Sequence, residues 1–271
     1  MKIIVGIPAR LGSSRLPGKP LMKIINKPMV QHVYERCCLC SSVDEVFIAT
    51  CDEKIATTAR KFGSKVVMTS KKIDRPSLRV AVASESMGLE DDDIVVVVQG
   101  DEPLVHPDMV SLAIRPLVEN PDIHVSNLVS EIVSDEEWKD PNEIKVVVDR
   151  NMNALYMSRS PIPYFGHDGA KGQRLKQVCI MPFKWHFMKK FNHQLIPTPN
   201  EITESIEMNR AIDHGIKVKM VKSDFISKSV DTSSDLRIVE KIMKNDEIYK
   251  YIENTGIHDR SKNSIKIETI L

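Results

Sequence analysis

A run of five β-branched apolar residues, 94–98, constrains the fold of this chain most strongly. It reads Ile-Val-Val-Val-Val without a polar interruption. A strand that is apolar at every position needs cover on both faces, as a central strand of a parallel sheet has. Similar runs alternate with segments of helical periodicity: strands at 3–7, 46–50 and 65–69, and helices at 28–40 and 52–62. We therefore expect an α/β fold with a doubly wound, mostly parallel sheet.

The loop after the first strand, residues 8–20, combines small residues with cations. Its small residues are Gly12, Ser13 and Ser14, and its cations are Arg10, Arg15 and Lys19. Small side chains let backbone N–H groups approach an anion, and the cations would hold a polyphosphate. A solvated basic loop fits the spacing equally well. The loop lacks the Gly-x-x-x-x-Gly-Lys-Ser/Thr spacing of a P-loop and the Gly-x-Gly-x-x-Gly of an NAD(P)-dependent oxidoreductase.

The strand at 94–98 ends in a second polar loop, Gln99-Gly100-Asp101. Doubly wound sheets bind ligands beyond the carboxyl ends of their strands, so this loop should lie beside the basic one. Gly100 permits a tight turn, and Asp101 then faces a position where a cation could bridge it to phosphates. A polar turn without a ligand is the alternative. We favour a metal, because an acid here follows a buried strand next to a basic loop.

The remainder of the chain predicts one domain with an insertion. Two strands around a turn at 150–151 indicate a small antiparallel insertion at 141–182. The domain is expected to span 1–250 and to be followed by a polar tail at 251–271. Capping signals predict that Asp52 begins the helix at 52–62 and that Gly215 stops a helix at 203–212.

Charge and cysteine usage limit the partners. The chain has 38 basic and 37 acidic residues, a formal net charge of +1, whereas nucleic-acid and membrane-surface binders usually carry a basic excess. No apolar run nears the roughly 20 residues of a spanning helix. Cys37, Cys38 and Cys40 lack a metal-binding spacing, and we expect them to pack as small apolar residues. We therefore expect a cytoplasmic protein whose partners include neither nucleic acid nor membrane.

Four stretches recur in order along the chain. They are Ile-Pro-Ala-Arg with Arg-Leu-Pro-Gly-Lys-Pro-Leu at 7–21, Val-Gln-Gly-Asp-Glu-Pro-Leu at 98–104, the run 141–164, and Val-Asp-Thr-Ser-Ser-Asp-Leu at 230–236. Together they resemble the 3-deoxy-manno-octulosonate (KDO) cytidylyltransferases, which are sugar nucleotidyltransferases. The resemblance extends over about residues 3 to 245. It implies a Rossmann-like sheet of the nucleotide-diphospho-sugar transferase type.

The resemblance also implies roles for individual residues. The nucleotide would contact Ala9, Arg10, Ser13, Ser14, Arg15, Lys19, Gln99 and Gly100. Asp101 and Asp231 would hold Mg²⁺, although Asp231 by itself fits a helix cap equally well. Lys19, Arg10 and Asp101 would carry catalysis. The insertion would form acceptor and homodimer surfaces.

The acceptor side departs from the family pattern. Ser70 stands where the family has an arginine, Gln177 replaces a histidine and Met208 replaces a glutamine, and only Arg79 remains of a His-x-Ser-Gly-Thr-x-Arg run. Lost hydrogen-bonding partners cost a polar ligand ~1–3 kcal/mol each. The residues expected to bind the acceptor are Arg75, Arg79, Lys145, Arg159, Gln177 and Glu207.

The predicted reaction is transfer of CMP from CTP to an anionic acceptor. An acceptor oxygen would attack the α-phosphorus in line with the departing pyrophosphate. KDO is the first candidate, while amino-KDO, another nonulosonic acid and a phosphonate stay open. A non-catalytic CTP-binding sensor is the rival from another class. It is less favoured, because a sensor would not need two metal-binding carboxylates.

Overall fold

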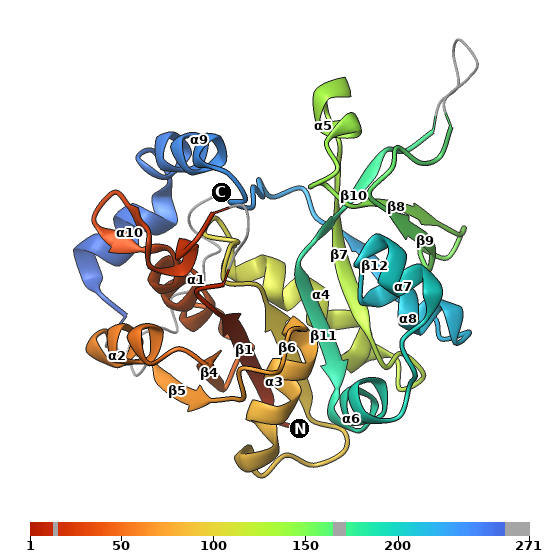
Figure 1. The fold of residues 1–271 in the computed structure, drawn as a ribbon, viewed down its shortest axis with the longest axis horizontal. Helices are drawn as coiled ribbons and strands as arrows, with labels where there is room; N and C mark the ends of the chain where they lie inside the picture. Colours follow the sequence, from red (N-terminus) through yellow and green to blue (C-terminus); the bar gives the residue numbers. More distant parts are fainter. Residues whose placement is uncertain (13–15, 165–171, 258–271) are drawn as a thin grey trace.

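A five-stranded sheet forms the centre of the computed structural model, which describes residues 1–12, 16–164 and 172–257. Its order is β11-β6-β1-β4-β5 (Figure 1). Four strands are parallel, and β11 runs antiparallel to β6. The bounds are β1 Ile3–Ala9, β4 Glu45–Thr50, β5 Lys65–Met68, β6 Ile94–Val98 and β11 Ile180–Lys184. The strand order reverses between β1 and β6, where doubly wound folds bind ligands.

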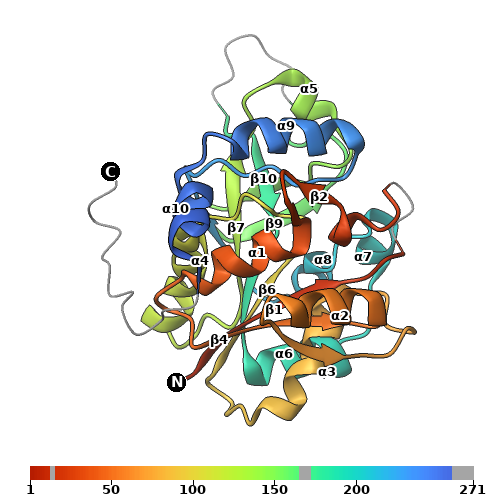
Figure 2. The ribbon, with the colours of Figure 1, turned by 90° about the vertical axis from the view of Figure 1, so that its left-hand side faces the viewer.

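Helices cover both faces of this sheet, as the apolar run at 94–98 predicted. Val5 and Ile7 pack with α1 and α4 on one face, and Ile4 packs with α3 and α6 on the other. Figure 2 shows α1 and α6 on opposite sides of β1. Gly6 allows α3 to lie close, because a Cβ there would be 2.4 Å from Val80 Cγ1. The helices are α1 Met29–Cys38, α2 Glu53–Lys61, α3 Pro76–Ser84, α4 Pro107–Glu119 and α6 Trp185–His193.

A second five-stranded sheet has the order β12-β7-β10-β8-β9 and is mainly antiparallel. Its strands are β7 Ser126–Glu131, β8 Lys145–Val148, β9 Ala154–Ser158, β10 Leu175–Val178 and β12 Lys219–Lys222. It is larger than the insertion predicted at 141–182, because β7 and β12 join from outside that range. The two sheets meet at a bridge between Val125 and Phe183. The predicted fold class, an α/β protein with an antiparallel addition, is confirmed.

The prediction of a single helix at 203–212 is wrong. The chain forms two short helices there, α7 Pro199–Glu204 and α8 Met208–Asp213. Ser205 separates them with a left-handed backbone (φ 54°), which ends α7 and turns the chain. The buried apolar residues Ile206, Met208 and Ala211 all follow this turn, whereas Ile202 before it is exposed.

Smaller elements complete the fold. A 3₁₀ turn at Lys19–Leu21 leads into the hairpin β2 Lys23–Ile24 and β3 Lys27–Pro28, and a second 3₁₀ turn covers Glu85–Met87. The remaining helices are α5 Asp135–Lys139, α9 Ser233–Met243 and α10 Glu247–Thr255. The sequence did not predict α3 or α10, and α10 crosses the expected boundary at residue 250. Cys37 and Cys40 are buried in the core as expected. Across the described residues, no helix has the length and apolarity needed to cross a membrane.

Candidate active site

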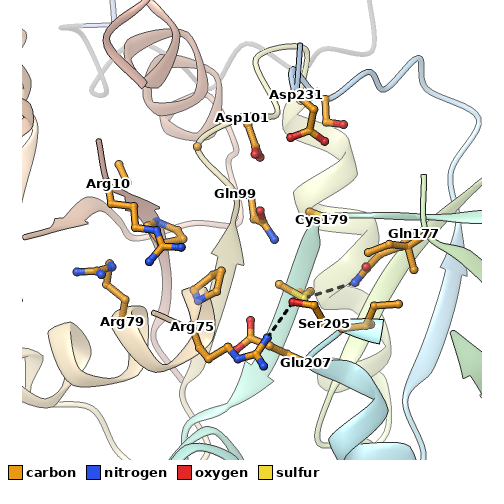
Figure 3. A pocket seen from close by; sticks show the side chains of 18 of the residues that line it. Arg10, Arg75, Arg79, Gln99, Asp101, Gln177, Cys179, Ser205, Glu207 and Asp231 are labelled. Carbon is orange, nitrogen blue, oxygen red and sulfur yellow. Dashed lines mark hydrogen bonds between the residues drawn. The ribbon is translucent and has the colours of Figure 1, made fainter. Parts of the chain in front are cut away.

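A cavity of about 490 Å³ opens at the carboxyl ends of β1 and β6. One end is lined by residues of the two predicted loops, namely Ala9, Arg10, Gly12, Lys19, Gln99, Gly100 and Asp101, together with Asp231. The other end is lined by Arg75, Arg79, Arg159, Gln177, Ser205 and Glu207. Figure 3 shows the two aspartates at one end and Arg75 with Glu207 at the other. Ser13, Ser14 and Arg15 lie outside the described residues.

Lys19 joins the two aspartates. Its Nζ donates hydrogen bonds to Asp101 Oδ2 at 2.5 Å, to Asp231 Oδ1 at 3.0 Å and to the carbonyl oxygen of Val230 at 3.0 Å. A further bond, from Val230 N to Asp101 O at 2.9 Å, ties the segment before α9 to the loop after β6. Burial by itself lowers the pKa of Lys19, but the two carboxylates outweigh it and the net pKa is raised. Lys19 is therefore a fixed positive charge at neutral pH.

The two carboxylates fit a divalent cation. Both contact the same ammonium, so that ammonium stands where a cation would be neutralised by Asp101 and Asp231. Carboxylate oxygens are preferred ligands of Mg²⁺, which commonly takes one or two carboxylates and completes its shell with water and substrate phosphates. Asp231 also lies just before α9, but the cap of that helix is the Thr232 side chain. Its carboxylate lines the cavity and accepts there from Lys19.

Gly100 lets the two nucleotide-side loops approach each other. A Cβ at this position would lie 3.1 Å from the carbonyl oxygen of Pro8, closer than side chains normally tolerate. Any other residue would therefore push the end of β6 away from β1. The basic loop is closed by a hydrogen bond from Gly18 N to Leu11 O at 3.1 Å, with Gly18 in the left-handed region (φ 72°).

Asp52 is the N-cap residue of α2, as predicted, and its side chain holds the basic loop. The expected N-cap bond is absent, and Asp52 Oδ2 accepts a hydrogen bond from Leu11 N at 2.8 Å. Asp52 stands at the predicted N-cap position, but its carboxylate reaches across to a neighbouring loop. Asp52 therefore fixes the backbone next to Arg10.

We expect Asp52→Ala to raise the KM for CTP roughly tenfold, because a hydrogen bond to a charged group contributes about 1.5–3 kcal/mol. Asp52→Asn should have a smaller effect, since its amide oxygen can still accept from Leu11 N. Asp44 is a matched control, since Asp44 Oδ2 accepts from Ile3 N at 2.7 Å at the opposite end of β1. Asp44→Ala should lower the melting temperature without changing the KM for CTP. Equal KM values for both alanine variants would contradict this role of Asp52.

The cations of the acceptor side are held to different degrees. Arg75 precedes α3, and its Nη1 donates to Ser205 Oγ at 3.4 Å. Arg159 lines the cavity from the end of β9. Arg79 also lines it, but its guanidinium donates to Thr69 Oγ1 and to the carbonyl oxygens of Ser70 and Ile73. Arg79 therefore shapes the 69–73 loop.

Lys145 differs from the expectation for an acceptor-binding residue. It is fully buried, and its Nζ donates to the carbonyl oxygens of Asp140 and Glu143, both at 2.7 Å. It is not among the residues that line the cavity. The sequence placed it on the correct strand, but the alternation of side chains along β8 directs it into the 140–143 turn.

Gln177 and Glu207 line the acceptor end and are held by neighbours. Gln177 Nε2 donates to Asn127 Oδ1 at 2.5 Å. Glu207 is buried and accepts from the hydroxyl and backbone N–H of Ser77 at 2.5 and 3.4 Å. Burial raises the pKa of Glu207, although Ser77 and the nearby arginines oppose this. The sequence does not single out Ser205, because it lies inside a segment with helical periodicity.

Glu102, directly after Asp101, is a buried acid with a perturbed pKa. Burial first and the charge of Asp101 second raise its pKa from 4.5 to about 7. The folded state therefore keeps a proton that the unfolded chain releases as the pH rises from 4.5. By linkage, the free energy of unfolding falls as the pH rises from 4.5 to about 7, and above that pH the loss is complete.

We expect Glu102→Gln to remove this pH dependence. The measured quantity is the free energy of unfolding of Glu102→Gln minus that of the wild type, both without nucleotide and metal. This difference should rise by roughly 3 kcal/mol between pH 4.5 and pH 8. Urea unfolding at several pH values measures the difference. Parallel curves for the two proteins would show that Glu102 ionises normally in the fold.

Comparison with known proteins gives consistent matches. The family model described as Cytidylyltransferase matches residues 4–223. A 3-deoxy-manno-octulosonate cytidylyltransferase from Geobacter metallireducens is 43% identical over 255 residues, which is 90% of this chain and 99% of the relative. An 8-amino-3,8-dideoxy-manno-octulosonate cytidylyltransferase from Shewanella halifaxensis is 39% identical over 241 residues, 89% of this chain and 98% of the relative. A solved CMP:2-keto-3-deoxy-manno-octonic acid synthetase in complex with CTP has a TM-score of 0.82 and 36% identity, covering 90% of this chain and 99% of that one.

Proposed function

This chain belongs to the cytidylyltransferase family and is a CTP-dependent enzyme, and on that premise we propose that it transfers CMP from CTP to KDO or a closely related sugar acid. The observation that supports this most is the division of one cavity into two ends. The first has cations and paired carboxylates suited to a nucleoside triphosphate. The second has the guanidinium groups of Arg75 and Arg159, which suit the carboxylate of an acid.

In this proposal the protein acts mainly by positioning and charge neutralisation. Arg10 and Lys19 bind the phosphates and stabilise the departing pyrophosphate, while Gln99 and the backbone around Ala9 and Gly100 contact the nucleotide. The acceptor hydroxyl attacks the α-phosphorus from the side opposite the pyrophosphate. Asp101 and Asp231 would hold Mg²⁺, which when bound supplies positive charge at the phosphate oxygens.

The acceptor end supports an acid with a restricted set of polar contacts. Arg75 has Ser205 as a partner, whereas Arg79 is engaged by its own loop. Met208 stands in the position of a hydrogen-bonding glutamine, and its side chain is fully buried beside the cavity. KDO remains the first acceptor, and 8-amino-KDO is the second because a relative named for it is nearly as similar.

Pyrophosphate release tests this function. The purified protein with CTP and Mg²⁺ should release pyrophosphate with KDO or 8-amino-KDO, and should do so more slowly with nonulosonic acids and with phosphonates. Replacing CTP by UTP or ATP is the control for the nucleotide. Tight CTP binding in calorimetry without release for any acid would support the non-catalytic sensor instead.

The same proposal includes a cytoplasmic homodimer formed through the insertion at 141–182. Sedimentation equilibrium provides the test, since a dimer has twice the 30.7 kDa of the chain. A monomer at assay concentration would remove this part of the proposal and leave the reaction unaffected.

A further inference from the structure

The turn between α7 and α8 connects the two arginines of the acceptor end. Glu204 is the last residue of α7, and Ser205 after it adopts the left-handed backbone. The Glu204 carboxylate points back to the end of β9, where it accepts from Ser158 Oγ at 2.6 Å and from Arg159 N at 2.8 Å. The next residue, Ser205, accepts from Arg75. One turn thus contacts both guanidinium-bearing residues.

Arg159 is attached to Glu204 at two places. Its backbone N–H donates to the carboxylate, and its side-chain Nε donates to the Glu204 carbonyl oxygen at 2.8 Å. Nη1 donates to the carbonyl oxygen of Pro141 at 2.9 Å. Within the described part of the chain, no hydrogen bond of Arg159 involves Nη2. The side chain is therefore fixed at Cα and at Nε, with Nη2 left to bind a ligand in the cavity that Arg159 lines.

The position of Glu204 is not explained by helix formation. A negative charge is unfavourable at the carboxyl end of a helix, where the helix dipole is also negative. The carboxylate instead has two short hydrogen bonds to β9, and Tyr156 OH lies 3.5 Å away. Glu204 itself is not among the residues that line the cavity. Any effect on a ligand must then pass through Arg159 or Ser205.

We propose that Glu204 is a positioning residue that orients Arg159 toward the carboxylate of the acceptor. The proposal rests on the proposed function, because it assigns Arg159 to the acceptor end. A long arginine side chain loses rotamer freedom when it binds a ligand, and a side chain that is already ordered loses less. Without the Glu204 carboxylate, the backbone at the end of β9 would lose its bond to this turn. The guanidinium would keep its bonds to the carbonyl oxygens of Glu204 and Pro141, but on a backbone that is held less precisely.

Steady-state kinetics with each substrate varied separately test this role. Glu204→Ala should raise the KM for KDO about tenfold, the loss expected for one preorganising hydrogen bond to a charged group. The KM for CTP should stay within twofold of the wild type. The KM of Glu204→Gln for KDO should lie between those of the wild type and Glu204→Ala, because the amide oxygen can still accept from Arg159 N. Glu119→Ala is the matched control, since Glu119 also ends a helix but is exposed.

A double-mutant cycle separates positioning from a merely structural role. If Glu204 acts through Arg159, the KM for KDO of Glu204→Ala/Arg159→Ala should equal that of Arg159→Ala alone. Independent, multiplying effects would overturn the proposal, as would equal increases in both KM values. If Glu204→Ala does not fold, Glu204→Gln in the same cycle decides the question. Failure of the wild type to use any acid would refute the proposed function, whereas an active wild type with an unchanged Glu204→Ala variant would refute the positioning role alone.

Discussion

Asp101→Asn is expected to lower kcat by roughly 10³-fold, the upper part of the range seen when a preorganised electrostatic group is removed from an active site. Asparagine keeps the shape of the side chain and removes its charge. The pairing with Lys19 at 2.5 Å would then weaken, and one of two carboxylates facing the phosphates would be lost. The fold should persist, because the turn after β6 is also held by backbone bonds from Glu102 N to Gln99 O and from Val230 N to Asp101 O.

Pyrophosphate release and thermal unfolding, measured on the same preparation, check this result. Asp92→Asn is the matched control, because Asp92 is an exposed aspartate just before the opposite end of β6. The control should keep wild-type turnover. If Asp101→Asn retains more than a tenth of wild-type kcat with its melting temperature unchanged, Asp101 is neither a catalytic residue nor a metal ligand.

Lys19→Met should lower kcat/KM for CTP by roughly 10²–10³-fold, because it removes the cation that we propose stabilises the departing pyrophosphate. Methionine keeps most of the aliphatic stem of lysine, so the loss reports on the ammonium. The same variant leaves Asp101 and Asp231 without the ammonium that bridges them. Two carboxylates without that counter-charge should bind a divalent cation more tightly in the absence of nucleotide.

Two measurements separate these effects. Initial rates at varied CTP give kcat/KM, and paramagnetic titration of free Mn²⁺ gives the affinity of the nucleotide-free protein. Lys23→Met is the control, because Lys23 is an exposed lysine in β2 only four residues away. Unchanged kcat/KM in Lys19→Met would exclude a role in phosphate binding. Weaker Mn²⁺ binding would show that Lys19 does not compete with the metal for the two carboxylates.

The sequence predicted that the two nucleotide-side loops lie together, and they line one end of the cavity, because the parts of each loop are local in sequence. A buried strand followed by a loop of small residues and cations places Ala9, Arg10 and Lys19 at one end of the sheet. The run 98–101 places Gln99 and Asp101 at the end of the neighbouring strand by the same logic. The strand order 94–98 next to 3–9 follows from the general behaviour of parallel α/β folds.

The acceptor side could be predicted only in part. Arg75 and Arg159 do line the cavity, but Lys145 is directed into a turn, and Arg79 is largely engaged by the 69–73 loop. Residue type and strand assignment do not determine which way a lysine or arginine points, because long side chains reach several alternative partners. The prediction of one continuous helix at 203–212 was wrong because the sequence does not mark the turn inside it. The apolar residues of this segment have a spacing that resembles one helix, and the left-handed turn at Ser205 has no glycine to mark it.

The sequence by itself determined the layered α/β fold, the edge of the sheet at which the cavity opens, and the charged residues that reach this edge. These features follow from the apolar pattern of single strands and from motifs a few residues long. Only the tertiary structure decided that Lys19, Asp101 and Asp231 form one cluster, since Lys19 and Asp231 are 212 positions apart. It also decided that Asp52 holds a loop and that Glu204 holds an arginine. Such contacts depend on how separate elements pack, and no local pattern encodes the direction in which a polar side chain reaches across that packing.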